Sequence, residues 1–341
     1  MDTSTRYMGL ELRNPLIASA SPLSKTVDSI RRLADAGVGA VVVYSLFEEQ
    51  LRREADRTAR VADAGTESFA ESLSYFPASA AEAGAAADAG PRHYLNLLER
   101  ASAAVEIPVI GSLNGATRGG WTRYARAMQD AGAAAIELNI YYLPGGQPTS
   151  GRDVEQRHVD ILHQVKASVT VPVAVKLSPH FSSAGEVAVR LDEAGADGLV
   201  LFNRFFQPDI DTENLTVVPA VDLSSPAEAR LPRTWIALLR VRVRASLAAT
   251  TGVDEPADVV KYLLAGADVV MTASALLRRG PEYAAVLLDG LAAWMVRKGF
   301  ADLGELRGML AVPPGEDQAA YERALYVTAL RAANSHTYGP W

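Results

Sequence analysis

The chain has 341 residues, 49% of them apolar, and its 33 basic and 40 acidic residues give a formal net charge of −7. It contains no cysteine, which excludes disulfide bonds, thiolate metal ligands and cysteine catalysis. Because it also lacks a dense basic run, a signal-peptide pattern and any apolar segment near the roughly 18 residues of a membrane helix, we expect a cytoplasmic protein that binds neither nucleic acid nor membranes.

Eight apolar segments are typical of strands buried on both faces of a parallel sheet, because their apolar residues are continuous and do not alternate with polar ones. Several follow a helical stretch that ends in Ala-Gly, where glycine supplies the left-handed residue that stops the helix. In chain order they lie within residues 14–22, 33–45, 107–115, 128–139, 171–179, 191–203, 245–253 and 263–273.

Eight strands with helical patterns between them predict an α/β fold of the (β/α)8 TIM barrel type. A doubly wound sheet also alternates strands and helices, but no G-x-G-x-x-G follows a first strand. We expect a single domain over residues 1–341, with a C-terminal helical extension. The connections from strand to helix are long, at 46–90, 140–152 and 204–231, as in barrels that carry an active site at the strand ends.

Polar residues follow the predicted strands at this catalytic face. Any one of them can simply cap the next helix, but together they form a ring of amides and hydroxyls around one lysine. Such a ring suits a heteroaromatic or phosphorylated ligand better than a metal ion. The residues are Ser19, Ser21, Tyr44, Ser45, Ser112, Asn114, Asn139, Lys176, Ser178, Asn203, Thr250, Thr251, Thr272 and Ser274.

Lys176 stands in the apolar segment "VAVKLSP", although lysine is rarely buried without a partner. Three interpretations remain open. The lysine reaches solvent at the strand exit, its ammonium stabilises negative charge on a bound cofactor, or it is a desolvated amine that forms a Schiff base.

The last two strands predict a phosphate site. Asp254 or Glu255 is expected to cap a helix that has Pro256 at its first position. Free backbone N–H groups at the start of such helices bind phosphate. These donors are expected at Thr250, Thr251, Gly252, Ala273 and Ser274.

These segments together resemble the dihydroorotate dehydrogenase family of FMN-dependent barrel enzymes, from about Met8 to Gly299. The resemblance rests on "NPLIASAS", "AGVGAVVVYS", "IPVIGSLNG", "AIELN", "VPVAVKLSP", "LVLFN" and "TTGVDEPADVVKYLLAGADVVMTASAL". Within the family, the chain looks closest to the divergent bacterial proteins called dihydroorotate dehydrogenase-like.

The resemblance implies an FMN-dependent oxidoreductase acting on a CH–CH donor, formally dihydroorotate to orotate in pyrimidine biosynthesis, with hydride transfer to flavin N5. It implies a homodimer, a small-molecule substrate and an electron acceptor that the sequence leaves open. It gives Lys176 a flavin contact and makes Asn114, Asn139 and Asn203 substrate ligands. The residues expected at the cofactor are Ser19, Ala20, Ser21, Tyr44, Ser45, Asn114, Asn139, Lys176, Asn203, Thr251, Gly252, Ala273 and Ser274.

The chain departs from the family pattern after the fourth strand, where Ser-Cys-Pro-Asn or Ser-Ser-Pro-Asn is replaced by the segment 140–144. Tyr142 stands closest to the position of the catalytic base, so Tyr142, Asn139 and Lys176 are the expected catalytic residues; alternatively, the two tyrosines only pack the loop. A family lysine is replaced by Tyr44. Family glycines are replaced by Ser21, Thr251 and Ala273.

Three alternatives to this function follow. The chain is a flavoprotein of the same family with a different substrate, a Schiff-base lyase that uses Lys176, or a barrel that binds a flavin or phosphate ligand without turnover.

Overall fold

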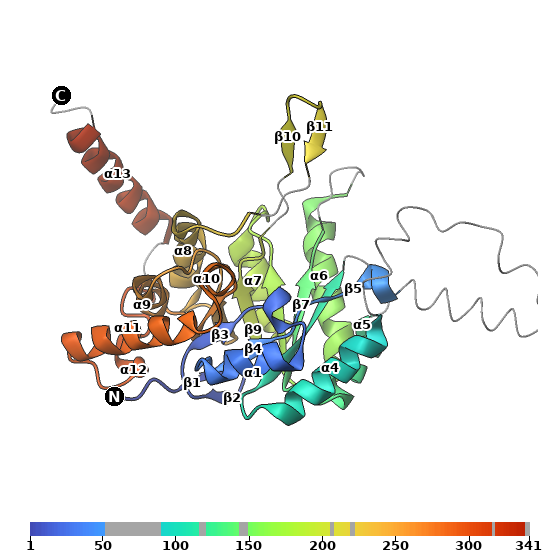
Figure 1. The fold of residues 1–341 in the computed structure, drawn as a ribbon. Coiled ribbons are helices and arrows are strands. Elements are labelled where there is room, and N and C mark those ends of the chain that lie inside the picture. The colour runs from blue at the N-terminus through green and yellow to red at the C-terminus, as the bar shows by residue number, and fades with distance from the viewer. Residues whose placement is uncertain are drawn as a thin grey trace, which may run out of the picture.

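A computed structural model describes residues 1–51, 90–115, 121–142, 149–204, 208–218, 222–315 and 318–337, and its centre is a closed parallel barrel (Figure 1). The barrel closes because β4 pairs with both β3 and β6, and β13 pairs with β3. In chain order its strands are β3 (Leu16–Ala18), β4 (Ala40–Val42), β6 (Val109–Gly115), β7 (Ala135–Ile140), β8 (Val173–Leu177), β9 (Gly198–Leu201), β12 (Ser246–Ala249) and β13 (Val269–Thr272). Seven of the eight predicted segments contain a whole strand, and the segment 128–139 contains β7 except for its last residue, which confirms the (β/α)8 fold.

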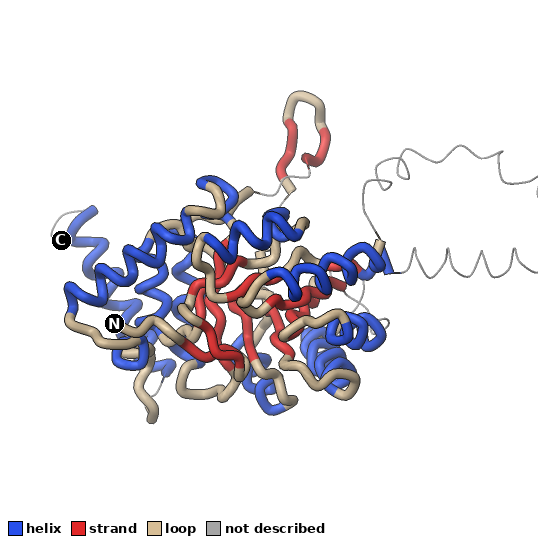
Figure 2. Tube along the Cα trace, turned by 60° about the horizontal axis from the view of Figure 1, so that its bottom comes forward, coloured by secondary structure: helices blue, strands red, loops and turns tan. Residues whose placement is uncertain are grey.

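Helices surround the strands, as the blue and red tubes of Figure 2 show. Gly266, with φ of +119°, ends α9 in the left-handed conformation expected of an Ala-Gly stop. The α-helices described are α1 (Val27–Asp35), α4 (Pro91–Ala104), α5 (Trp121–Asp130), α6 (Gly151–Lys166), α7 (Ala184–Glu193), α8 (Arg230–Leu239), α9 (Pro256–Ala265), α10 (Ser274–Arg279), α11 (Tyr283–Lys298), α12 (Leu303–Leu306) and α13 (Gln318–Thr337). Two 3-10 turns, η1 (Pro22–Ser24) and η2 (Pro226–Ala229), precede α1 and α8.

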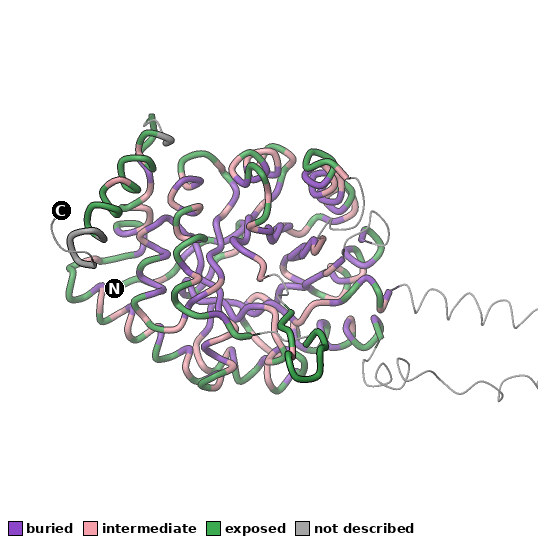
Figure 3. The backbone as a smooth tube through the Cα atoms, turned by 90° about the horizontal axis from the view of Figure 1, so that it is seen from above, coloured by how far each residue is buried: buried purple, intermediate pink, exposed green. Residues whose placement is uncertain are grey.

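The barrel buries both faces of its strands, and Figure 3 shows the buried strands inside a ring of more exposed helices. One apolar cluster lies between strands and helices, and a second fills the barrel interior. The second cluster includes Tyr7 and Met8 from a hairpin of β1 (Thr5–Tyr7) and β2 (Leu10–Leu12), which was not among the predicted elements. Gly198 leaves space for it, because a Cβ there would lie 2.9 Å from the Met8 side chain. The hairpin therefore closes the amino-terminal end of the barrel.

The opposite end carries the strand-to-helix connections. The short strand β5 (Leu46–Phe47) pairs with β6 there, and a second hairpin, β10 (Asp209–Asp211) with β11 (Thr216–Val218), projects above the barrel in Figure 1. Among the described residues, no helix combines the length and apolar character needed to cross a bilayer.

Candidate functional site

A row of polar residues crosses three neighbouring strands at the open end of the barrel. Asn114 of β6 pairs in register with Asn139 of β7, which in turn pairs with Lys176 of β8. Residues in register on parallel strands point to the same face, and this face is the barrel interior, because Ala135 and Ala174 on the same faces of β7 and β8 belong to the interior cluster. The strand register therefore brings these three predicted residues together.

Asn203, which follows β9, joins this row. Its Nδ2 donates to Oδ1 of Asn139 over 2.7 Å. Asn139 is buried, whereas Asn203 is half-buried. We call Asn139 and Asn203 the amide pair. Between them they offer a carbonyl and an NH2 group to a ligand at the barrel mouth.

Lys176 is paired inside the barrel with Glu137, which precedes Asn139 on the same face of β7. The Lys176 Nζ lies 3.5 Å from Glu137 Oε1, and the two side chains are 9% and 1% exposed. Among the described residues, Glu137 Oε2 has no hydrogen-bond partner. A neutral Lys176 would leave the carboxylate as an uncompensated buried charge. The Lys176 Nζ is therefore engaged with a buried carboxylate and is not the unpaired amine that Schiff-base chemistry requires, and the burial of Lys176 argues against a side chain that reaches solvent.

Glu137 is not among the residues predicted for the site, because it lies within its strand and not at the strand end. The signal was available, since Glu137 interrupts the apolar run "AIELN" as Lys176 interrupts "VAVKL". Two titratable residues of opposite charge on adjacent buried strands are expected to pair, because neither is tolerated alone.

A cavity of about 310 Å³ lies on the other side of the mouth, and Ala20, Ser21, Tyr44 and Ser45 are among its lining residues. The Ser45 and Ser112 hydroxyls are 2.9 Å apart. Ser21 also caps η1, since its Oγ accepts from the backbone N–H of Leu23 over 3.3 Å. Ser19, which directly follows β3, is buried. Four of the residues expected at the cofactor therefore line the same cavity.

Tyr44 is held within this cavity by two neighbours. Its ring meets Tyr94 edge to face, with centroids 5.2 Å apart, and the Lys25 ammonium lies 5.7 Å from its centroid. The Lys25 ammonium therefore lies beside Tyr44, which occupies the position where the resemblance expects a lysine.

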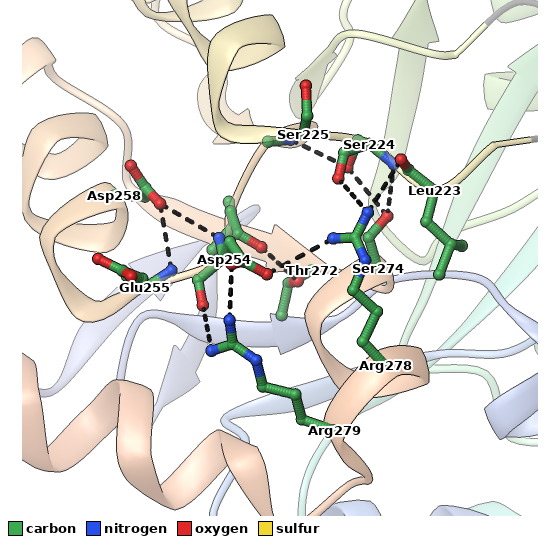
Figure 4. A network of polar contacts seen from close by, with 12 residues as sticks. Leu223, Ser224, Ser225, Asp254, Glu255, Asp258, Thr272, Ser274, Arg278 and Arg279 are labelled. Carbon is green, nitrogen blue, oxygen red and sulfur yellow. Dashed lines mark hydrogen bonds and ion pairs between the residues drawn. The ribbon is translucent and has the colours of Figure 1, made fainter.

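The predicted phosphate site is formed by the loops after β12 and β13, and a segment before η2 lies across it (Figure 4). The Gly252 N–H donates to Ser224 Oγ over 3.1 Å, and Ser224 Oγ lies 2.9 Å from Ser274 Oγ. Arg278 Nη2 donates to the Ser224 carbonyl over 2.9 Å. We call Gly252, Ser224 and Ser274 the cradle. Neither Ser224 nor Arg278 was found from the sequence, because Ser224 lies 28 positions before Gly252 in a long connection.

The loop after β12 keeps a glycine-like backbone despite its threonine. Thr251 has φ of +80° and Gly252 has φ of +71°, although a β-branched residue strongly disfavours positive φ. Thr251 thus adopts a conformation that favours glycine, at a position where the resemblance expects a glycine. Glu255, one of the two caps considered, is the N-cap of α9, with Pro256 at the first helical position.

Tyr142 lies against α6, with the Arg157 guanidinium 3.9 Å from the centroid of its ring. The Tyr141 N–H donates to the Gly115 carbonyl over 2.9 Å. Residues 143 and 144, which complete the altered family segment, lie outside the described residues.

His158 is a packing residue of α6. Its Nδ1 lies 2.8 Å from the Val154 carbonyl, and its ring meets Phe181 edge to face. Burial lowers the pKa of His158, so the neutral imidazole is favoured. Within the described ranges, no three His, Asp or Glu side chains gather as a candidate metal site.

A family model described as dihydroorotate dehydrogenase matches residues 3–295 of the chain. The catalytic subunit of dihydroorotate dehydrogenase B (NAD(+)) from Methanothermobacter thermautotrophicus is 28% identical over 324 residues, which cover 89% of this chain and 97% of that protein. The Listeria monocytogenes (serotype 4a) protein of the same name is 31% identical over 63% of this chain and 71% of its own. A putative dihydroorotate dehydrogenase A (fumarate) from Aeropyrum pernix is 28% identical over 65% of this chain and 74% of its own.

Proposed function

The chain belongs to the dihydroorotate dehydrogenase family, and from this premise we propose that it uses FMN to oxidise dihydroorotate to orotate. The observation that carries the proposal is the row of Asn114, Asn139 and Lys176, with Asn203 beside it, at the open end of the barrel. When bound, FMN supplies the hydride acceptor of the reaction. The residues of the chain have to orient the substrate, remove a proton and offset the charge that develops on the ring.

The donor set at the mouth fits the polar edge of a flavin. Lys176 supplies a cation that is fixed by Glu137 and opposes negative charge on a reduced ring. The cavity with Ser21, Tyr44 and Ser45 supplies hydroxyls and an aromatic face. Lys176 and these three residues are therefore the proposed flavin contacts in the barrel.

The cradle fits the phosphate of FMN chemically. Gly252 offers a backbone N–H, Ser224 and Ser274 offer hydroxyls, and the Arg278 guanidinium lies beside them. A bound phosphate would take over the hydrogen bonds that the two serines and Gly252 now make to one another. Binding therefore requires Ser224 to move away from the Gly252 N–H.

The amide pair and Asn114 are proposed to bind the substrate. Dihydroorotate carries ring N–H groups and carbonyls, which match the acceptor and donor atoms of asparagine. The mutual bond between Asn203 Nδ2 and Asn139 Oδ1 fixes which atoms remain free for the ligand.

Tyr142 is proposed as the catalytic base, with Arg157 supplying positive charge against its ring. We expect Tyr142→Phe to slow flavin reduction by dihydroorotate by about 10²- to 10⁴-fold, the usual contribution of a general base. Anaerobic stopped-flow reduction of the bound flavin measures this rate, with Tyr141→Phe as the matched control. An unchanged rate in Tyr142→Phe would remove Tyr142 from the mechanism and leave it a packing role.

The electron acceptor is a separate question, because the names of the relatives give NAD(+) for one type and fumarate for another. The proposal covers the dihydroorotate half-reaction, and NAD(+) and fumarate are the first acceptors to assay. We also expect that borohydride traps no carbonyl substrate on Lys176, because its Nζ is engaged in the ion pair with Glu137. A trapped adduct would instead support the lyase alternative.

The experiment that tests the function is the visible spectrum of the purified protein, identification of the released ligand, and anaerobic addition of dihydroorotate. We expect FMN and its bleaching by dihydroorotate. A protein that holds FMN but is not bleached would overturn the substrate and keep the flavoprotein. A colourless protein that takes up no added FMN would overturn both.

A further inference from the structure

A second cavity of about 360 Å³ opens beside Asn203 of the amide pair. Its lining includes charged residues that are not among those predicted from the sequence. Asn203 and Thr251 form the wall nearest the barrel mouth. Arg204, in the loop after β9, and Arg230, at the start of α8, also line the cavity. We call it the arginine cavity. Its volume is sufficient for part of a small molecule.

Positive charge is in surplus in this cavity. Arg204 Nε donates to Glu228 Oε1 over 3.0 Å. The neutralising carboxylate therefore lies at one edge of the guanidinium. Among the described residues, Glu228 is the only side chain with which Arg204 forms an ion pair, and the Arg230 guanidinium has no such partner. Two arginines against one glutamate leave a formal charge of +1 among the three.

Glu228 is itself fixed, so Arg204 is held in place. Glu228 Oε2 accepts from the backbone N–H of Ser225 over 2.6 Å, as the third residue of a capping box. These bonds lower the pKa of Glu228 against the opposing effect of its partial burial. The glutamate therefore supports the Arg204 guanidinium, whose terminal nitrogens bond no other part of the described chain and can bind a planar oxyanion.

The start of α8 strengthens this charge. η2 runs directly into α8, and this continuous segment lines the cavity from Ala227 to Pro232 except for Ala229 and so places its amino end, with its positive partial charge, at the cavity. Within the lining, only Glu228 is acidic.

We infer that the arginine cavity is an oxyanion subsite, in which Arg204 and Arg230 bind the carboxylate or phosphate of a small-molecule ligand held by the amide pair. This inference rests on the proposed function only in taking the amide pair as the place where the ligand reacts. It assigns the substrate an anionic group directed from Asn203 toward α8. The two arginines then determine specificity and do not take part in the chemistry.

Orotate and uracil test the subsite, because they differ only in the carboxylate. We expect Arg204→Gln and Arg230→Ala each to weaken orotate binding by about ten- to hundredfold, the effect of losing a hydrogen bond to a charged group, and to leave uracil binding unchanged. Arg233→Gln is the matched control, since Arg233 lies one turn further along α8 and outside the cavity lining. Dissociation constants are measured by calorimetry on the purified protein at fixed ionic strength.

Glu228→Gln gives a test of opposite sign. It removes the neutralising charge while keeping an acceptor for the Ser225 N–H, so we expect orotate to bind several-fold more tightly. Damage to the fold does not produce tighter binding, so this variant separates charge from structure. Weaker or equal orotate binding in Glu228→Gln would count against the subsite.

Inorganic phosphate and malonate separate the failure of the subsite from the failure of the proposed function. If orotate does not bind but these anions do, and their binding falls in Arg204→Gln and Arg230→Ala, the subsite stands and dihydroorotate is the wrong substrate. If orotate binds equally to wild type and both variants, the subsite is overturned and the proposed function stands. If none of the anions binds, both are overturned.

Discussion

Replacing Lys176 by methionine is expected to lower the free energy of unfolding by about 3 kcal/mol, because it leaves Glu137 as an unpaired charge in the barrel. This loss is at the lower end for a broken buried pair, since Nζ and Oε1 are 3.5 Å apart. Urea unfolding measures it. Burial raises the pKa of Tyr7 well above its usual value, so its hydroxyl stays neutral, and among the described residues this hydroxyl makes no hydrogen bond that would stabilise the Glu137 carboxylate.

The double variant Lys176→Met, Glu137→Leu is the control. With both charges gone, no unpaired charge is left in the interior, and most of the lost stability is expected to return. A single Lys176→Met variant that unfolds at the wild-type urea concentration would show that the pair contributes nothing.

The same two variants separate stability from cofactor binding. The double variant is expected to fold but to bind FMN more weakly than the wild type, because the cation proposed to contact the flavin ring is missing. Retention of FMN by the folded double variant at wild-type affinity would remove Lys176 from the flavin site while leaving its structural role. This comparison requires no turnover.

The barrel could be predicted from the sequence because its strands are buried on both faces, and such strands are continuous apolar runs. The β1–β2 hairpin could not, because its strands are three residues each and resemble an irregular amino-terminal segment. The hairpin is buried because Tyr7 and Met8 pack into the barrel interior, in the space that Gly198 leaves by having no side chain.

The candidate site was predictable where it depends on strand register. Asn114, Asn139 and Lys176 each lie near the carboxyl end of a recognisable apolar run, and parallel pairing places such ends together. The contacts that complete the site join distant parts of the chain. Ser224 reaches Gly252, and Arg204 reaches Glu228, from long connections that have no periodic pattern of their own. Spacing in the sequence carries no information on such contacts.

Gly252 is the position in the cradle where a small change is expected to have a large effect. A Cβ there would lie 2.7 Å from both the Ala229 nitrogen and the Ser225 carbonyl oxygen, which are backbone atoms at the η2 turn and cannot rotate away. Its φ of +71° adds the cost of a left-handed L-residue. We expect Gly252→Ala to lower the free energy of unfolding by about 3 kcal/mol, the sum of strain and overpacking.

Gly299→Ala is the matched control, because Gly299 has a similar φ of +82° and a Cβ added there would meet nothing within 4 Å. It is expected to cost about 1 kcal/mol, the strain alone. Equal losses in the two alanine variants would mean that η2 moves freely away from the loop after β12. The larger loss at Gly252, together with weaker FMN binding, would mean that η2 is packed rigidly on that loop. Ser224, two residues before η2, is then held at the Gly252 N–H by the same packing, so the turn that supports Glu228 also shapes the phosphate site.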